Sequence, residues 1–268
     1  MTYMSKLIAI GCSYTEHYLD SMHTETKLDY PRWPQLLAKK LDMECVNLGL
    51  CGIGHEYMIF KLLEVLMSKK DIGLVVIMWS EWQRMEFEHE DGWQQLMPHR
   101  DNSGVEKWPL NRDGRITLLQ YNNETASTIR SLRYFLMAQE LLKDIPYLMV
   151  QGCNPLVDPM YLHPEDADVN WENVINLRKK AIKQIINSPI TDKIKEKYFI
   201  GWPIFKSIGG FYLDNILDDI DPNRTKLRVD ENDSHPNKRG HKVFSEVIYK
   251  RYSKVYKPHL GVWRSDLL

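Results

Sequence analysis

Long hydrophobic runs are missing from this sequence. No stretch of the 268 residues approaches the ~20 consecutive apolar residues that a membrane-spanning helix needs. The N-terminal residues Met1–Lys6 lead into a short apolar segment, without the long hydrophobic core and small-residue cleavage site of a secretory signal. We therefore expect no membrane partner and a location in the cytoplasm.

Cysteine is scarce, and its spacing is irregular. The four cysteines include no CxxC pair, and most end apolar runs, which favours buried free thiols over a metal or redox site. The nine histidines show no HExxH or comparable ligand spacing. The sequence therefore predicts no metal and no cofactor. The cysteines are Cys12, Cys45, Cys51 and Cys153.

An excess of charge of either sign is also absent. Lys and Arg total 35 against 36 Asp and Glu, which gives a net charge of −1. The basic residues are dispersed rather than gathered in a stripe, so we expect no nucleic-acid partner. An apolar content of 43% is enough for one large domain with a substantial core.

Short apolar runs alternate with stretches of helical spacing along the chain. This rhythm predicts an α/β fold with three layers, a parallel sheet flanked by helices. We expect a single domain over 1–257, a C-terminal tail over 258–268, and irregular insertions at about 84–120 and 153–170, where turn formers and prolines gather. The expected strands are 7–10, 44–48, 74–79, 147–151 and 199–202, and the expected helices are 34–41, 58–67, 124–142, 171–186 and 238–252.

Candidate functional residues follow the predicted strands at their carboxyl ends, the edge where open parallel sheets place their sites. Ser13 comes after the first strand, Gly52 after the second and Ser80 after the third. Asp233 and His235 lie in the loop before the last helix. A serine, a histidine and an aspartate brought together at one edge are the components of a nucleophilic hydrolase.

Each of these residues also has a simpler interpretation. Ser13 could cap a helix, because serine is a preferred N-cap. Asp233 or Ser234 could cap the last helix, although residues two apart in extended backbone share a side, which would let Asp233 meet the His235 imidazole. Gly52 could belong to a nucleotide-binding turn, but Gly49-x-x-Gly52-x-Gly54 reverses the dinucleotide fingerprint.

These blocks, in this order, resemble the SGNH (GDSL-type) hydrolase superfamily. Gly11-Cys12-Ser13 is similar to its first block, Gly52 lies where the second block has its oxyanion glycine, and Asp233-Ser234-His235-Pro236 is similar to the fourth block. The likeness spans almost the whole chain and is that of a divergent subgroup of the kind found in phage and bacteria. The resemblance implies an SGNH or flavodoxin-like fold.

Two departures from the family pattern concern the chemistry. Ser80 stands where the third block has an oxyanion-donating asparagine, and loss of one such donor typically costs ~10²–10³ in rate. The family aspartate lies three residues before the histidine, a position held here by Asn232. Asp233 lies one residue nearer, and Asp230 is the alternative orienting residue.

The leading hypothesis is a serine esterase or acyl-ester hydrolase. Ser13 would attack the ester, His235 would act as base and Asp233 would orient the ring. The backbone N–H groups of Ser13 and Gly52, with Ser80, would hold the oxyanion. The resemblance implies a small-molecule or O-acetylated carbohydrate ester as substrate.

The alternative is a non-catalytic or weakly active binding or structural protein, such as a virion-associated one. Tryptophans that could stack on a sugar or pack internally are Trp82, Trp93, Trp108 and Trp171.

Overall fold

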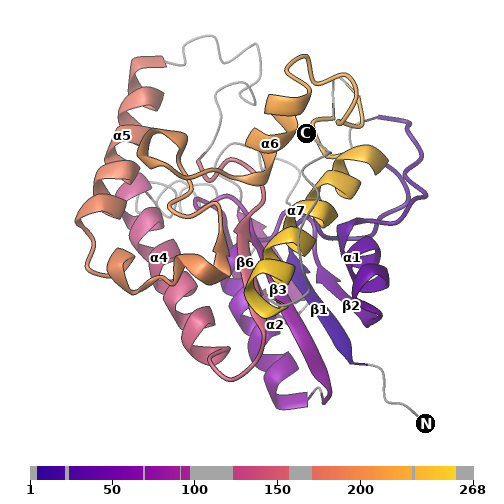
Figure 1. The fold of residues 1–268 in the computed structure, drawn as a ribbon. Coiled ribbons are helices and arrows are strands. Elements are labelled where there is room, and N and C mark those ends of the chain that lie inside the picture. The colour runs from indigo at the N-terminus through magenta and orange to yellow at the C-terminus, as the bar shows by residue number, and fades with distance from the viewer. Residues whose placement is uncertain are drawn as a thin grey trace.

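The computed structural model describes residues 5–21, 24–68, 70–90, 92–96, 123–156, 171–230 and 233–257. Within these ranges the chain forms one five-stranded sheet, a two-stranded hairpin and six α-helices around the sheet (Figure 1). The predicted tail over 258–268 and most of both predicted insertions lie outside the described residues, so the domain limits stay a prediction.

The five-stranded sheet is entirely parallel. Its strand order is β2-β1-β3-β6-β7, and every neighbouring pair runs in the same direction. This order is that of a doubly wound flavodoxin-like sheet, in which the direction of winding reverses beside the first strand. The strands are β1 (Lys6–Gly11), β2 (Glu44–Gly49), β3 (Ile72–Trp79), β6 (Tyr147–Gln151) and β7 (Phe199–Ile200).

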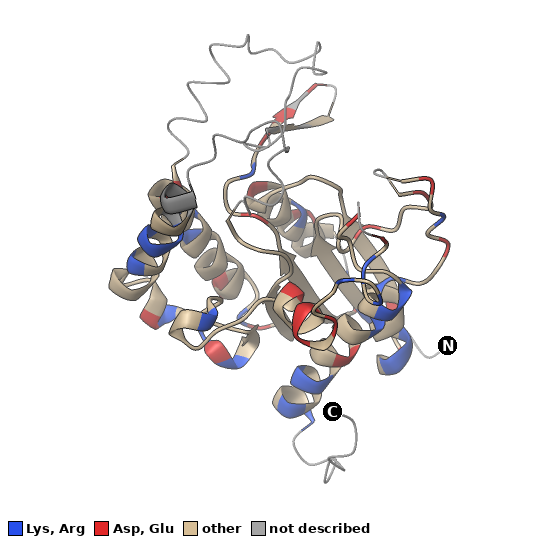
Figure 2. Cartoon of the chain, turned by 90° about the horizontal axis from the view of Figure 1, so that it is seen from above, with Lys and Arg blue, Asp and Glu red and all other residues tan. Residues whose placement is uncertain are grey.

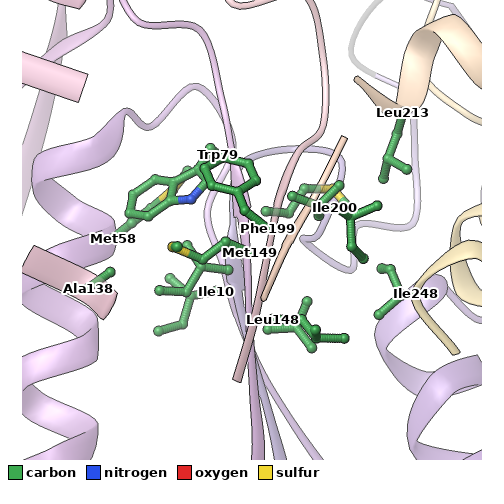
Figure 3. Packing of buried hydrophobic residues seen from close by; sticks show 14 of the residues in the cluster. Ile10, Met58, Trp79, Ala138, Leu148, Met149, Phe199, Ile200, Leu213 and Ile248 are labelled. Carbon is green, nitrogen blue, oxygen red and sulfur yellow. The ribbon is translucent and has the colours of Figure 1, made fainter. Parts of the chain in front are cut away.

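Helices cover both faces of this sheet. Buried side chains alternate along the strands, so that Ile10 and Met149 point toward α2 and α4, while Leu148 and Ile200 point toward α6 and α7 (Figure 3). Helix α5 packs on α4 and α1 packs on α7, which completes the two outer layers. The helices are α1 (Trp33–Leu41), α2 (His55–Ser68), α4 (Glu124–Leu141), α5 (Trp171–Asn187), α6 (Leu213–Ile220) and α7 (Lys238–Tyr256), with short 3₁₀ turns at η2 (Thr191–Lys193), η3 (Glu196–Tyr198) and η4 (Lys206–Ile208).

The predicted fold class, a parallel sheet between two helical layers, is confirmed. Each predicted strand and helix is present, with ends that differ by a few residues. Helix α6 was not expected, because its eight residues are too short to establish a clear helical period. The expectation of irregular structure from residue 84 was wrong for its first part, where β4 (Met85–His89) and β5 (Gly92–Leu96) form an antiparallel hairpin.

Charged residues of both signs are interspersed over the outer helices and loops (Figure 2). Among the described helices, none is both long enough and apolar enough to cross a membrane. The four cysteines are free thiols, of which Cys12 and Cys153 are buried and Cys45 and Cys51 are partly buried.

Candidate active site

Ser13 lies in a tight turn directly after β1, at the carboxyl edge of the sheet. The N–H groups of Thr15 and Glu16 both donate to the carbonyl of Cys12, at 2.8 and 3.0 Å. Residues 13–21 contain no helix, so Ser13 is not a helix cap. Because β1 has β2 on one side and β3 on the other, the turn lies at the switch point where such sheets form their sites.

Ser13, His235 and Asp233 form a continuous chain of hydrogen bonds. The Ser13 Oγ lies 2.9 Å from the His235 Nε2, and the His235 Nδ1 lies 2.6 Å from the Asp233 Oδ1. A carboxylate can only accept, so Nδ1 carries the ring proton and Nε2 is left to accept the hydroxyl proton of Ser13. The two-residue spacing of Asp233 and His235 therefore permits the contact that the sequence predicted.

The Asp233 carboxylate is 1% exposed, and both of its oxygens accept hydrogen bonds. Its Oδ1 also accepts the backbone N–H of His235 at 3.0 Å, and its Oδ2 accepts the hydroxyl of Ser21. Burial alone would raise the pKa of Asp233, but the hydrogen bond and charge of His235, with the Ser21 hydroxyl, outweigh burial and hold that pKa well below its usual value. The carboxylate is therefore ionised throughout the neutral range.

The loop that carries Asp233 and His235 is fixed by Arg228, which is 3% exposed. Its Nη1 donates to the carbonyl of Ser234 at 2.9 Å and to the Oδ1 of Asp214 at 2.6 Å. The backbone of Val229 also donates to the carbonyl of His235 at 2.9 Å. These bonds hold the histidine backbone in one position.

The N-cap of α7 is Asn237, whose side chain accepts from the N–H groups of Arg239 and Gly240. The alternative in which Asp233 or Ser234 caps this helix therefore does not apply. Asp233 is left to bond the histidine ring.

Two tyrosines pack edge-on against the His235 ring. Tyr14 lies 5.3 Å and Tyr18 lies 6.2 Å from it between ring centroids. The Tyr14 hydroxyl donates to the Asp214 Oδ2 at 3.0 Å, which ties this ring to the same Asp214 that pairs with Arg228. The imidazole is thus held by packing as well as by hydrogen bonds.

Gly52 lies in the loop between β2 and α2 with a φ of +74°, a conformation that favours glycine. Within the described part of the chain, the backbone N–H groups of Ser13 and Gly52 meet no acceptor. The carbonyl of Cys51, which precedes Gly52, accepts from the Gln95 Nε2 at 2.7 Å. These two N–H groups have the chemical character required of an oxyanion hole.

Ser80 is fully buried after β3, and its hydroxyl donates to the carbonyl of Ile53 at 2.9 Å. The same carbonyl accepts from the Arg84 Nη1 at 3.2 Å. Because a hydroxyl has a single proton to donate, this arrangement does not favour Ser80 as an oxyanion donor. It instead anchors the loop that contains Gly52.

The remaining candidates have other surroundings. Asp230 accepts the backbone N–H of Asp233 at 3.0 Å through its Oδ1. Trp82 is buried and donates to Gln151, while Trp93 packs against α2; the side chains of Trp108 and Trp171 lie outside the described residues. Among the residues described, no group of three His, Cys, Asp or Glu side chains is placed to hold a metal ion.

Sequence reasoning missed Ser21, Arg228 and Gln95. Ser21 and Arg228 support the Asp233–His235 segment from loops with no recognisable pattern. Gln95 belongs to the hairpin that was expected to be irregular. Its partner in the hairpin register, Glu86, is a buried side chain near the Gly52 loop.

Glu86 bonds the N-terminus of α2. It is 2% exposed, its Oε1 accepts the Tyr57 N–H at 3.0 Å, and its buried Oε2 has no partner among the described residues. A Cβ on Gly54 would collide with this carboxylate. Burial raises the pKa of Glu86 from 4.5 to about 7, against the opposing effect of the Tyr57 N–H.

Glu86→Gln is therefore expected to become more stable relative to wild type as pH rises. The unfolded chain releases this proton near 4.5 and the folded chain near 7, so wild type loses roughly 3 kcal/mol of unfolding free energy across that interval. The neutral amide loses none. The free energy of unfolding in urea should be measured for both proteins at pH 5 and pH 8. The value for Glu86→Gln minus that for wild type should increase by about that amount between the two pH values. A difference that does not change with pH would contradict the assignment.

Compared by sequence with protein-family models, the chain matches none, and it matches no curated protein. Several solved structures are similar to it. A lipolytic G-D-S-L family member from Veillonella parvula is 14% identical, over 94% of this chain and 98% of that one, with a TM-score of 0.45. A variant of an acetyl xylan esterase from Geobacillus stearothermophilus is 12% identical, over 97% of both chains, with a TM-score of 0.47.

A lipase/acylhydrolase from Enterococcus faecalis is 13% identical, over 94% of this chain and 96% of that one, with a TM-score of 0.46. The first of the three structures belongs to the G-D-S-L family, the class that the sequence motifs resemble.

Proposed function

We propose that this chain is a serine hydrolase of acyl esters. The observation that carries the proposal is the hydrogen-bonded series Ser13 Oγ, His235 Nε2, His235 Nδ1 and Asp233 Oδ1, with separations of 2.9 and 2.6 Å. A hydroxyl that meets the acceptor nitrogen of a carboxylate-oriented imidazole can become a nucleophile.

The proposed reaction has two halves. Ser13 Oγ attacks the ester carbonyl while His235 accepts the hydroxyl proton and returns it to the leaving alcohol, which forms an acyl-serine. Water, activated by the same imidazole, then releases the acid and restores Ser13. The carboxylate of Asp233 stabilises the imidazolium in both halves.

The tetrahedral oxyanion is held by backbone N–H groups in this proposal. The donors are those of Ser13 and Gly52, which face no acceptor in the described chain. Ser80 contributes by anchoring Ile53 rather than by donating to substrate. No cofactor takes part.

The substrate is a small acyl ester. O-acetylated carbohydrate is the class suggested by the resemblance to the SGNH hydrolases, and it remains part of the proposal. The location in the cytoplasm likewise remains a prediction.

A fluorophosphonate probe tests the proposal directly. Wild type should be labelled covalently, and Ser13→Ala should not, because the probe reacts with an activated serine hydroxyl. Ser234→Ala is a matched control on the same loop as the base, where the backbone carbonyl rather than the side chain makes the bond to Arg228. Absence of labelling in wild type, together with absence of p-nitrophenyl acetate hydrolysis, would leave the non-catalytic binding or structural protein as the better account.

A further inference from the structure

The peptide group that joins Cys51 to Gly52 is hydrogen-bonded on its carbonyl side by the β4–β5 hairpin. Its carbonyl oxygen, on Cys51, accepts the hydrogen bond from Gln95 Nε2 at 2.7 Å. The carbonyl and the N–H of one planar trans peptide point in opposite directions. A side chain that fixes the Cys51 carbonyl therefore also fixes the direction of the Gly52 N–H.

The peptides on either side have other partners. The N–H of Cys51 donates to the Glu16 Oε2 at 2.5 Å. On the other side the N–H of Ile53 donates to the carbonyl of Leu50 at 3.4 Å, and one peptide further on the carbonyl of Ile53 accepts from Ser80 and Arg84. Gln95 thus acts on the one peptide of this loop whose N–H the oxyanion would use.

Gln95 lies on the face of the hairpin that packs against α2. In the antiparallel register Gln95 lies opposite Glu86, and paired residues share a face. On that face Glu86 bonds the Tyr57 N–H. Trp93 packs against Tyr57 and Phe60 with ring centroids 5.4 and 5.2 Å apart. The hairpin is therefore anchored to α2 at points beside Gln95, which restricts where its amide can lie.

We propose that Gln95 is a positioning residue of the oxyanion hole. It aims the Gly52 N–H toward the carbonyl oxygen of an ester on Ser13, and its hydrogen bond to Cys51 polarises that N–H through the peptide group. This role rests on the proposed hydrolase function. Because negative charge develops on the substrate oxygen only in the transition state, the contribution belongs to kcat rather than to KM.

Gln95→Met tests the role, since methionine has a similar length and no N–H donor. For p-nitrophenyl acetate we expect kcat to fall about tenfold, the scale of one hydrogen bond, with KM changed by less than about twofold. Binding of a trifluoromethyl ketone, which forms a tetrahedral oxyanion on the serine, should weaken by the same factor as kcat/KM. The unfolding temperature should fall by no more than about a few degrees, the effect of losing one partly buried hydrogen bond.

Phe87→Ala is the matched control, on the opposite face of the same hairpin, and should keep kcat within about twofold. Gln95→Glu is a second variant of the same shape, whose ionised carboxylate cannot donate, and should lose at least as much kcat as Gln95→Met.

Wild-type kcat in both Gln95 variants would overturn the positioning role. The hydrolase assignment would still stand if Ser13→Ala is inactive in the same assay. Equal kcat losses in Phe87→Ala and Gln95→Met would also overturn it, because they would indicate general disruption of the hairpin. Full activity in Ser13→Ala would overturn the hydrolase and the Gln95 role together.

Discussion

His235→Ala is expected to lower kcat for p-nitrophenyl acetate by ~10⁴ or more, the scale seen when a triad base is removed. The imidazole is the only group hydrogen-bonded to the Ser13 hydroxyl within the described residues. Without it the serine proton has no acceptor during attack and the alcohol has no donor as it leaves. Steady-state rates and thermal unfolding, measured side by side, test this expectation.

His241→Gln provides a matched control for the loss of a buried histidine. His241 lies six residues further on in α7, is 1% exposed, and accepts the Trp33 N–H at 3.4 Å through Nδ1. We expect its replacement to lower the unfolding temperature while kcat of the folded protein stays within a few-fold of wild type. A His235→Ala protein that folds and retains wild-type turnover would exclude His235 as the base.

Asp233→Asn is expected to lower kcat by about 10⁴, the scale seen when a triad aspartate is replaced by asparagine. The asparagine can keep the shape of the site, and its carbonyl can still accept from His235. It lacks the negative charge that stabilises the imidazolium as Ser13 attacks. The depressed pKa of Asp233 shows that the folded site favours the charged form, and this is the form that asparagine cannot supply.

Asp230→Asn tests whether Asp230, rather than Asp233, orients the imidazole of His235. The Oδ1 of Asp230 accepts the backbone N–H of Asp233 at 3.0 Å, whereas the two imidazole nitrogens of His235 meet Asp233 and Ser13. We expect its kcat to fall less than about tenfold. A silent Asp233→Asn alongside a strongly damaged Asp230→Asn would assign the orienting role to Asp230.

Much of the candidate site was predictable because its residues follow strands that the sequence shows clearly. β1 and β3 are continuous apolar runs, and their ends locate the turns after Gly11 and Trp79 at one edge of the sheet. The contact between Asp233 and His235 could be anticipated from their spacing, because residues two apart in extended backbone share a side. Local rules therefore located Ser13 as well as the neighbouring Asp233 and His235.

The supports of the site were not predictable in the same way. Ser21 and Gln95 act across long sequence separations, Arg228 acts on residues of nearby segments, and no period or motif in their own segments marks any of the three. Ser80 shows the limit of a positional argument. It follows the expected strand, yet its proton is directed to Ile53, a contact that depends on how the neighbouring loop folds.

The sequence separation of 222 between Ser13 and His235 has a consequence for when the site can form during synthesis. β1, which precedes Ser13, is synthesised well before the loop that carries His235, so the two residues can meet only after the intervening strands and helices have left the ribosome. A contact of such long range closes late and slowly compared with local structure. A nascent chain that has not yet reached His235 would therefore carry an unpaired Ser13, and formation of the Ser13–His235 bond would report the assembly of all the intervening elements rather than the folding of any one part.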